Sequence, residues 1–396
     1  MAMPPASLVA CNIYITAAAS QRATLLQLLC KAQEQCHQLR SQSQTDGAVV
    51  VGSEAQHARN KERMLSAVGI IHAYADIPYD RSSFHIAGRS DCVSDVAASL
   101  VCNAVTDMEF DPFGYDGGKS RHPFVGLVDH VSVMPLVYPK NNDSSLEDNI
   151  GSMSCRDAAA ANAAREIGRR ISTTNLVNVH YYGRACPHNT PLSKVRRERT
   201  SFFGSGGAID RKQKGQQYCD QIITNAVKGD TTIGTPVGGF VENFNIRLTS
   251  NVNLNQAKSL TQFVRGRNIN TMGYGVVGVE ALTLPYVRDP LSGDTVVYEV
   301  ACNLTNPHEG GVTQIRDQLN QWIEKETAEL SSEMNVETSK LNYDYFVEDA
   351  YRVGTTEEQC LRALMNINES ETSIPDNFWE GYDKEVFSNF EDNLLQ

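Results

Sequence analysis

Short runs of apolar and β-branched residues alternate along the chain with longer segments in which apolar residues recur every three or four positions. The short runs predict buried strands, and the longer segments predict amphipathic helices. In the first half, strands are predicted at 7–15, 65–77, 83–88, 122–137 and 177–183, and helices at 20–40, 92–105 and 155–171. This order, β-α-β-β-α-β followed by α-β, is typical of a ferredoxin-like arrangement, with an antiparallel sheet and helices on one face.

A pattern of the same kind starts again after Val237. Strands are predicted at 238–248, 274–287 and 295–304, and helices at 253–264 and 315–330. A short helix is predicted in the segment TTEEQCLRALM, where Thr355 and Glu358 have the spacing of a capping box. The expected fold class is therefore α+β, with two similar halves and a C-terminal extension.

The changes of composition along the chain suggest where these parts begin and end. We expect an N-terminal subdomain over 1–205, in which the polar segment 41–63 is a loop or insertion. The basic and glycine-containing segment 206–232 is expected to be a connector, and 233–365 a C-terminal subdomain.

The remaining tail, 366–396, carries eight acids and one lysine with aromatic residues interleaved among them. Its composition favours a disordered or loosely docked extension. The alternative is a segment that binds a protein partner, for which the aromatic side chains would supply anchors.

The overall composition narrows the class of partner. The chain has 396 residues and a formal net charge of −12, which argues against a nucleic-acid or anionic-membrane partner because both require a basic surface. No apolar stretch reaches the roughly 18 residues of a membrane-spanning helix. Ten cysteines are spread singly without CxxC spacing, which favours a reducing, cytoplasmic compartment. A chloroplast location would need further residues before the first strand.

The predicted strand HPFVGLVDHVSVMPLV begins with one histidine, His122, and carries a second, His130, in its middle. Pro123 pushes His122 toward extended geometry, so this imidazole is expected at the strand entrance, where it could exchange protons near neutral pH. Asp129 and His130 are neighbours in the strand and should face opposite sides, so they are not expected to form a dyad. From the spacing alone, purely structural histidines are the favoured interpretation.

Two other strands carry polar rows. Alternation places Asn243, Asn245 and Arg247 on one face of a strand, where they offer hydrogen-bond donors and a cation suited to a heterocycle and a carboxylate. Glu299 and Asn303 share a face of a later strand, and the two rows would form one polar surface if the strands are neighbours. An ordinary solvated face of an antiparallel sheet is the alternative.

Several common catalytic patterns are missing from the sequence. It contains no GxxxxGK[ST] phosphate loop, no GxGxxG at a strand–helix junction and no Gly-x-Ser-x-Gly turn. There is no HExxH, and the nine histidines show no metal-binding spacing, so no metal is expected.

The segment HPFVGLVDHVSVMPL resembles the HPxxGxVDHxxxxPL motif of the formiminotransferase family, especially its stand-alone plant and algal members. Further similar segments follow in the family's order over about residues 7–365. These segments are SLVACNIYIT, DIPYDRSSFHIAG, VHYYGRA, VENFNIRL, VYEVACNLTNP and NYDYFVEDAYRVGTTEEQCLRAL.

The resemblance implies two ferredoxin-like subdomains that face each other across a cleft, in a homodimer. It implies transfer of a formimino group from N-formimino-L-glutamate to tetrahydrofolate, as a step of histidine metabolism, without a metal. The family's catalytic histidine corresponds to His122, and its partner aspartate to Asp76, with Asp80 as a rival.

The family's folate-binding asparagines correspond to Asn243 and Asn245, with Asn303 as a further candidate. Arg247, or another arginine such as Arg81, would hold a carboxylate of the amino-acid-like substrate.

One residue departs from the family pattern. Many members have arginine two positions after the motif histidine, where this chain has Phe124. The alternative function is therefore a catalytically altered folate-binding or assembly protein on the same fold, with the tail as its partner-binding segment.

Overall fold

The computed structural model describes residues 7–17, 21–43, 67–76, 78–110, 122–137, 153–199, 226–287, 296–334 and 341–367. These residues form two compact units with separate hydrophobic cores. The first unit lies within Met1–Gly114, Pro123–Gly239 and Thr356–Gly381. The second consists of His122 and the described residues within Phe240–Thr355.

A six-stranded sheet in the order β2-β3-β1-β4-β6-β5 forms the centre of the first unit. Its strands are β1 (Leu8–Ile15), β2 (Val68–Asp76), β3 (Arg81–Arg89), β4 (Val128–Pro135), β5 (Asn178–Gly183) and β6 (Asp230–Thr235). Every second residue of β1 is an apolar residue of the core, as the alternation in the sequence predicts.

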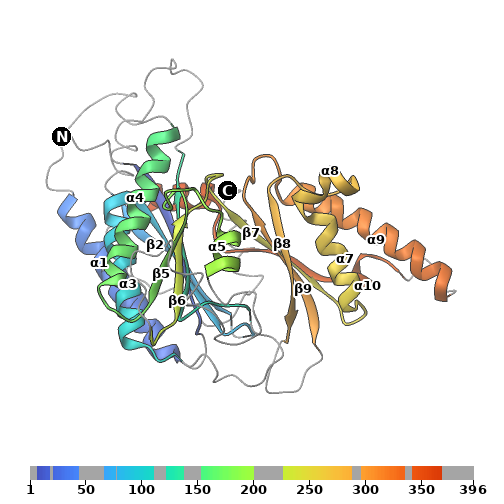
Figure 1. Cartoon of the computed structure of the whole chain (residues 1–396), viewed down its shortest axis with the longest axis horizontal. Helices are drawn as coiled ribbons and strands as arrows, with labels where there is room; N and C mark the ends of the chain where they lie inside the picture. Colours follow the sequence, from blue (N-terminus) through green and yellow to red (C-terminus); the bar gives the residue numbers. More distant parts are fainter. Residues whose placement is uncertain are drawn as a thin grey trace, which may run out of the picture. The chain divides into compact units, whose positions relative to one another are not determined.

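Three helices cover one face of this sheet: α1 (Arg22–Ser43), α3 (Ser90–Asp107) and α4 (Met153–Ser172) (Figure 1). The apolar stripe of α3 packs on the strands and on both neighbouring helices. Two shorter helices also contact the sheet: α5 (Leu192–Arg199) packs on β5 and β6, and α11 (Glu357–Asn366) on β2 and β3.

The first sheet is mixed, whereas the sequence pattern predicts an antiparallel one. The pairs β2–β3, β3–β1 and β1–β4 are antiparallel, but β4–β6 and β6–β5 are parallel. After β4, the helix α4 brings the chain back to the end of the sheet at which β4 begins, so β5 runs in the same direction as β4. The later strand β6 then pairs between them.

The limits of the units differ from the expected subdomain boundaries in two places. Residues 230–235 form β6, which is buried along its whole length within the first sheet, although the sequence pattern assigned them partly to a connector and partly to the second subdomain. The helix α11 also belongs to the first unit, because the chain returns to β2 and β3 after the second unit is complete.

The second unit contains a four-stranded antiparallel sheet in the order β10-β7-β9-β8. Its strands are β7 (Glu242–Leu248), β8 (Val279–Tyr286), β9 (Val297–Leu304) and β10 (Val347–Val353). The helices α7 (Leu254–Val264) and α9 (Val312–Met334) pack on one face of this sheet (Figure 1). Trp322 of α9 is fully buried in the core of this unit. Short helical turns are η3 (Gly266–Asn268), α8 (Ile269–Met272) and α10 (Tyr343–Phe346).

The predicted α+β class is confirmed, and the element order β-α-β-β-α-β occurs in both units. In each, the first four strands lie in the spatial order fourth, first, third, second. The polar segment predicted at 41–63 lies mostly outside the described residues, and its first three residues form the end of α1, which reaches Ser43. Most of the tail 366–396 also lies outside them. Among the described residues, no helix combines the length and apolar character that crossing a membrane requires.

Candidate functional site

The segment from His122 to Leu127 enters β4 as irregular chain held by backbone hydrogen bonds. His122 is half-buried and belongs to the second unit, whereas Pro123 and the residues after it belong to the first. Gly126 forms an isolated bridge to Gly229, and a Cβ atom there would lie 2.3 Å from the carbonyl oxygen of Asp230. The motif glycine is therefore needed because two backbones pass in contact.

A β-bulge at the start of β4 changes the prediction for Asp129 and His130. The pairing with β1 shifts register, so that Tyr14 pairs with His130 and Ile15 with Val128. Val128 and Val131 both point into the core, and the two residues between them both leave it. Asp129 and His130 thus lie on the same side of the sheet, because the extra residue of a bulge interrupts alternation. This side, opposite the helices α1, α3 and α4, is called the open face.

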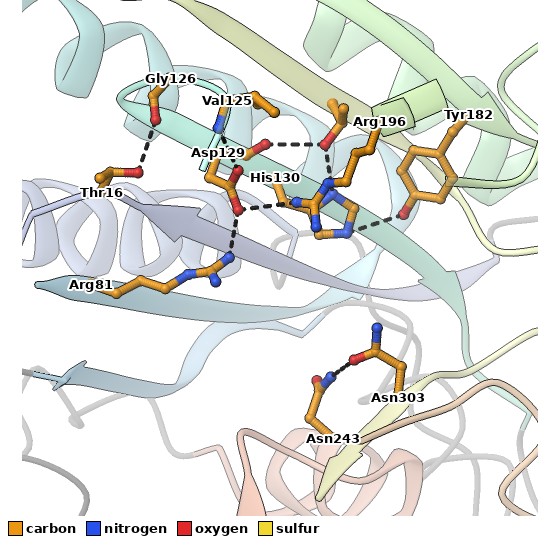
Figure 2. A network of polar contacts seen from close by, with 11 residues as sticks. Thr16, Arg81, Val125, Gly126, Asp129, His130, Tyr182, Arg196, Asn243 and Asn303 are labelled. Carbon is orange, nitrogen blue, oxygen red and sulfur yellow. Dashed lines mark hydrogen bonds and ion pairs between the residues drawn. The ribbon is translucent and has the colours of Figure 1, made fainter. Parts of the chain in front are cut away.

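Asp129 is fully buried and receives three donors (Figure 2). Arg81 and Arg196 each place Nη2 on its Oδ2, at 2.7 and 3.0 Å, and the backbone N–H of Val125 donates to Oδ1 at 3.0 Å. The Arg81 guanidinium also lies 4.7 Å above the Tyr14 ring. This carboxylate therefore joins the motif segment to β3 and to α5.

His130 lies between two tyrosine rings on the open face, 5.9 Å from Tyr14 and 5.3 Å from Tyr182. Its Nδ1 is 3.1 Å from the hydroxyl of Thr232, which itself donates to the Asp129 carbonyl oxygen at 3.0 Å. Because that hydroxyl proton is used, Nδ1 must carry the imidazole proton and Nε2 the lone pair. Burial, together with the nearby Arg196 and Arg81 cations, holds the pKa of His130 well below its ordinary value.

Other histidines and tyrosines continue this open face across β1, β2 and β3. The rings of His72 and His85 are 5.3 Å apart, and Ser83 contacts His85 Nε2 at 2.9 Å. Burial lowers the pKa of His72 to about 4 and that of His85 well below its ordinary value. Burial also raises the pKa of Tyr74 well above its usual range, so the rings of His72, His85 and Tyr74 stay uncharged near neutral pH.

The predicted partner aspartate, Asp76, ends β2 and belongs to the first unit. Its Oδ1 accepts the backbone N–H of Tyr79 at 3.2 Å, which closes the turn to β3. Its rival Asp80 occupies that turn with a positive φ of 48°. Asp76 therefore stabilises the turn between β2 and β3, and Asp80 forms part of it. Both aspartates belong to the first unit, whereas His122 belongs to the second.

The polar rows predicted in the second unit are neighbours. Strands β7 and β9 pair so that Asn243 is opposite Asn303 and Arg247 is opposite Glu299. The Asn243 amide nitrogen donates to the Asn303 carbonyl oxygen at 2.6 Å, on the exposed part of the face (Figure 2). One continuous polar surface results, as the alternation of both strands indicates.

Arg247, the predicted carboxylate-binding residue, already contacts an internal carboxylate. Its Nη2 is 3.3 Å from Glu299 Oε2 and donates to the Tyr351 hydroxyl at 2.6 Å. The guanidinium lies 3.9 Å from the centre of the Tyr286 ring. Asn245 donates from Nδ2 to Glu299 Oε1 at 2.7 Å.

The sequence pattern named Arg81 and Glu299 as candidates but did not predict the charge pairs that they form, Arg81 with Asp129 and Glu299 with Arg247. The group of Asp129, Arg81 and Arg196 depends on a bulge and on a distant helix, which spacing does not reveal. Glu299 had one usable signal: it is a single acid within the apolar run VVYEVAC, and such an acid needs a partner when the strand is buried. Within the described part of the chain, no cluster of three or more His, Cys, Asp or Glu residues could hold a metal ion.

Comparison with known proteins supports the motif-based resemblance. Residues 42–235 match the family of the formiminotransferase domain, N-terminal subdomain. A curated protein of Arabidopsis thaliana, the formiminotransferase cyclodeaminase-like protein, is 24% identical over 279 residues, which cover 65% of this chain and 82% of that protein. The predicted similarity to the formiminotransferase family is therefore confirmed.

Two solved structures are much more distant. The periplasmic protease PqqL of Escherichia coli matches with a TM-score of 0.17 at 11% identity, over 92% of this chain and 41% of that one. A peptidase M16 inactive domain from Pseudomonas fluorescens matches with a TM-score of 0.18 at 9% identity, over 93% and 89% of the two chains. Scores this low carry no argument about fold or function.

Proposed function

We propose that the similarity to formiminotransferases reflects a shared activity: transfer of a formimino group from N-formimino-L-glutamate to N5 of tetrahydrofolate. The observation that carries the proposal is the match over 42–235, which includes the motif of His122 and the strand of Asp76. The proposed protein is a cytoplasmic homodimer with ferredoxin-like subdomains. Tetrahydrofolate serves as the co-substrate.

In the proposed reaction, N5 of tetrahydrofolate attacks the formimino carbon and forms a tetrahedral intermediate. His122 accepts the proton that N5 loses, and then returns a proton to the amine of glutamate as the bond from that nitrogen to carbon breaks. The products are 5-formimino-tetrahydrofolate and glutamate. Asp76 orients the imidazole in this scheme, and Asn243, Asn245 and Asn303 bind the folate.

Arg247 has a different part from the one expected from the sequence. Because its guanidinium pairs with Glu299 and stacks on Tyr286, we assign it to the support of the folate surface. The substrate carboxylates would then be held by other cations, and the identity of the amino-acid donor stays part of the proposal.

The second candidate function is a catalytically altered folate-binding or assembly protein. The observation that favours it is Phe124, which occupies the position of the family's arginine and packs edge-to-face on Phe110, with ring centres 5.9 Å apart. An apolar contact at this position removes a cation that other members offer to substrate. The tail 366–396, most of which lies outside the described residues, is the proposed partner-binding segment in this case.

The activity is tested with purified protein, N-formimino-L-glutamate and tetrahydrofolate, by following the absorbance of the folate product after acid conversion. His122→Ala should lower kcat by about 10²–10⁴-fold, the usual contribution of a general base. His188→Ala, which removes an exposed imidazole, is the matched control and should retain activity. Equal activity of wild type and His122→Ala would remove His122 from the role of base.

Titration calorimetry with tetrahydrofolate separates the two candidates from a protein of unrelated function. Binding with turnover supports the transferase, and binding without turnover supports the altered protein. No binding would exclude both folate proposals.

A further inference from the structure

Glu299 is a fully buried carboxylate at the centre of the second unit's sheet. It lies on β9, on the face opposite the helices α7 and α9, because its neighbours Val300 and Cys302 alternate with it into the core. Burying a carboxylate is unfavourable unless it is paired and hydrogen-bonded. The partners of Glu299 therefore show how this charge affects the polar residues of β7 and β9.

Three donors converge on Glu299: two from β7, which pairs with β9, and one from β10, the strand beyond β7. Arg247 pairs with Oε2 at 3.3 Å, the Tyr351 hydroxyl donates to the same oxygen, and Asn245 Nδ2 donates to Oε1 at 2.7 Å. Arg247 balances the charge, and its stacking 3.9 Å from the Tyr286 ring centre fixes the guanidinium.

The consequence for Asn245 is a defined orientation of its side-chain amide. An ionised carboxylate only accepts hydrogen bonds, so the amide must turn its nitrogen toward Glu299 and its oxygen away. In the neighbouring pair Asn243–Asn303, by contrast, each amide contacts another amide, at 2.6 Å, which can either donate or accept.

We infer that Glu299 is a positioning residue that fixes the Asn245 amide, so that its carbonyl oxygen receives an N–H donor of the bound pterin heterocycle. This inference rests on the proposed function, which makes Asn245 a folate-binding residue. It adds the group that Asn245 recognises and the residue that sets its orientation. Glu299 itself does not touch the ligand in this scheme.

A double-mutant cycle on the full chain tests the inference by calorimetry with tetrahydrofolate. Asn245→Ala and Glu299→Gln should each raise Kd about tenfold, the loss of roughly one hydrogen bond. Because Glu299 acts through Asn245, the double variant should bind no more weakly than Asn245→Ala alone. Additive effects would overturn the inference, since Glu299 would then act on folate independently.

Controls keep the test informative if Glu299→Gln folds poorly. Glu299→Asp retains the charge for Arg247 but draws the carboxylate back from Asn245, and it should weaken binding in the same non-additive way. Glu280→Gln removes an exposed carboxylate from the same face and should leave Kd unchanged. Thermal denaturation identifies any variant that is simply unfolded.

A second measurement separates failure of this inference from failure of the proposed function. In ¹⁵N-labelled protein, the side-chain amide signal of Asn245, assigned by its loss in Asn245→Ala, should shift in Glu299→Gln and stay in place in Glu280→Gln. An unshifted signal in Glu299→Gln would overturn the positioning role. If wild type binds no tetrahydrofolate, the folate proposal and the pterin contact fall together, and the amide signal alone decides the role of Glu299.

Discussion

In each unit, a buried carboxylate on the face of the sheet opposite the main helices pairs with an arginine that stacks on a tyrosine. In the first unit this set is Asp129, Arg81 and Tyr14, and in the second it includes Glu299 and Arg247. Such pairs gain little net stability over apolar contacts, but they define the position of every member. The polar faces therefore depend on charge pairs whose partners are required together.

The first prediction concerns Asp129→Asn, which removes the charge between Arg81 and Arg196 but keeps the volume of the side chain. Two arginines whose side chains are only 14% and 11% exposed would lose their common counter-charge, so we expect the free energy of unfolding to fall by about 3–5 kcal/mol. Urea denaturation measures the change. Glu166→Gln is the matched control, because it breaks an arginine pair on the exposed surface of α4 and should cause no measurable loss. Equal losses in both variants would contradict a special role for burial.

The second prediction concerns acid stability. The pKa of His72 is lowered by burial from 6.5 to about 4, so between these values the unfolded chain binds a proton that the folded chain does not. Stability is thus fully present above pH 6.5 and decreases as the pH falls toward 4, by at most about 3 kcal/mol for this group. Urea denaturation at pH 7, 5.5 and 4.5 should show a shallower decrease for His72→Gln than for wild type. His188→Gln, at an exposed site, should follow wild type.

Alternation along a strand predicts single residues well where the strand is regular. Asn243 and Asn303 were expected on one polar surface and they contact each other. The same argument is wrong for Asp129 and His130, because a bulge places both on one side. A bulge depends on how a strand pairs with its neighbour, and the local order of apolar and polar residues does not determine this pairing.

At the scale of elements, the N-cap of helix α11 differs by one residue from the one that the sequence predicts. The sequence pattern favours Thr355 with Glu358, but in the structure Thr356 accepts the backbone N–H of Gln359, and the Gln359 side chain accepts the N–H of Thr356. Two adjacent threonines can both begin the helix by sequence. The burial of Thr355 decides between them.

The third prediction follows from this cap. Thr356→Ala should destabilise α11 by about 1 kcal/mol, which is typical for the loss of an N-cap side chain. Hydrogen exchange of the backbone amides in α11 should become about fivefold faster, the rate equivalent of that free energy. Thr355→Ala should change this exchange less. The opposite order would restore the capping box expected from the sequence.

Most strands of the chain are predictable from periodicity, and the two that were not predicted share a physical reason. The strands β6 and β10 were not predicted, because DTTIGT is short and rich in threonine, and VEDAYRV contains several charged residues. Both become strands through pairing with partners already in place, β4 and β5 for the one and β7 for the other. Tertiary context of this kind overrides local propensity.

At the scale of the whole molecule, two separate cores predict separate responses to cavities. Phe84 is fully buried in the first core, and Phe244 is almost fully buried in the second. Phe84→Ala and Phe244→Ala should each lower the free energy of unfolding of the unit concerned by about 3–5 kcal/mol. Hydrogen exchange should accelerate mainly in the strands of the altered unit. Equal acceleration in both units would indicate a single cooperative structure.

The return of α11 to the first unit has a consequence for biosynthesis. The sheet of that unit is complete in sequence at β6, yet the helix that packs on β2 and β3 follows the entire second unit. While the ribosome is still translating the second unit, these two strands have been made but the helix that packs on them has not. Nascent chains stalled after Gly239 should therefore be cleaved more readily by protease near β2 than released full-length protein.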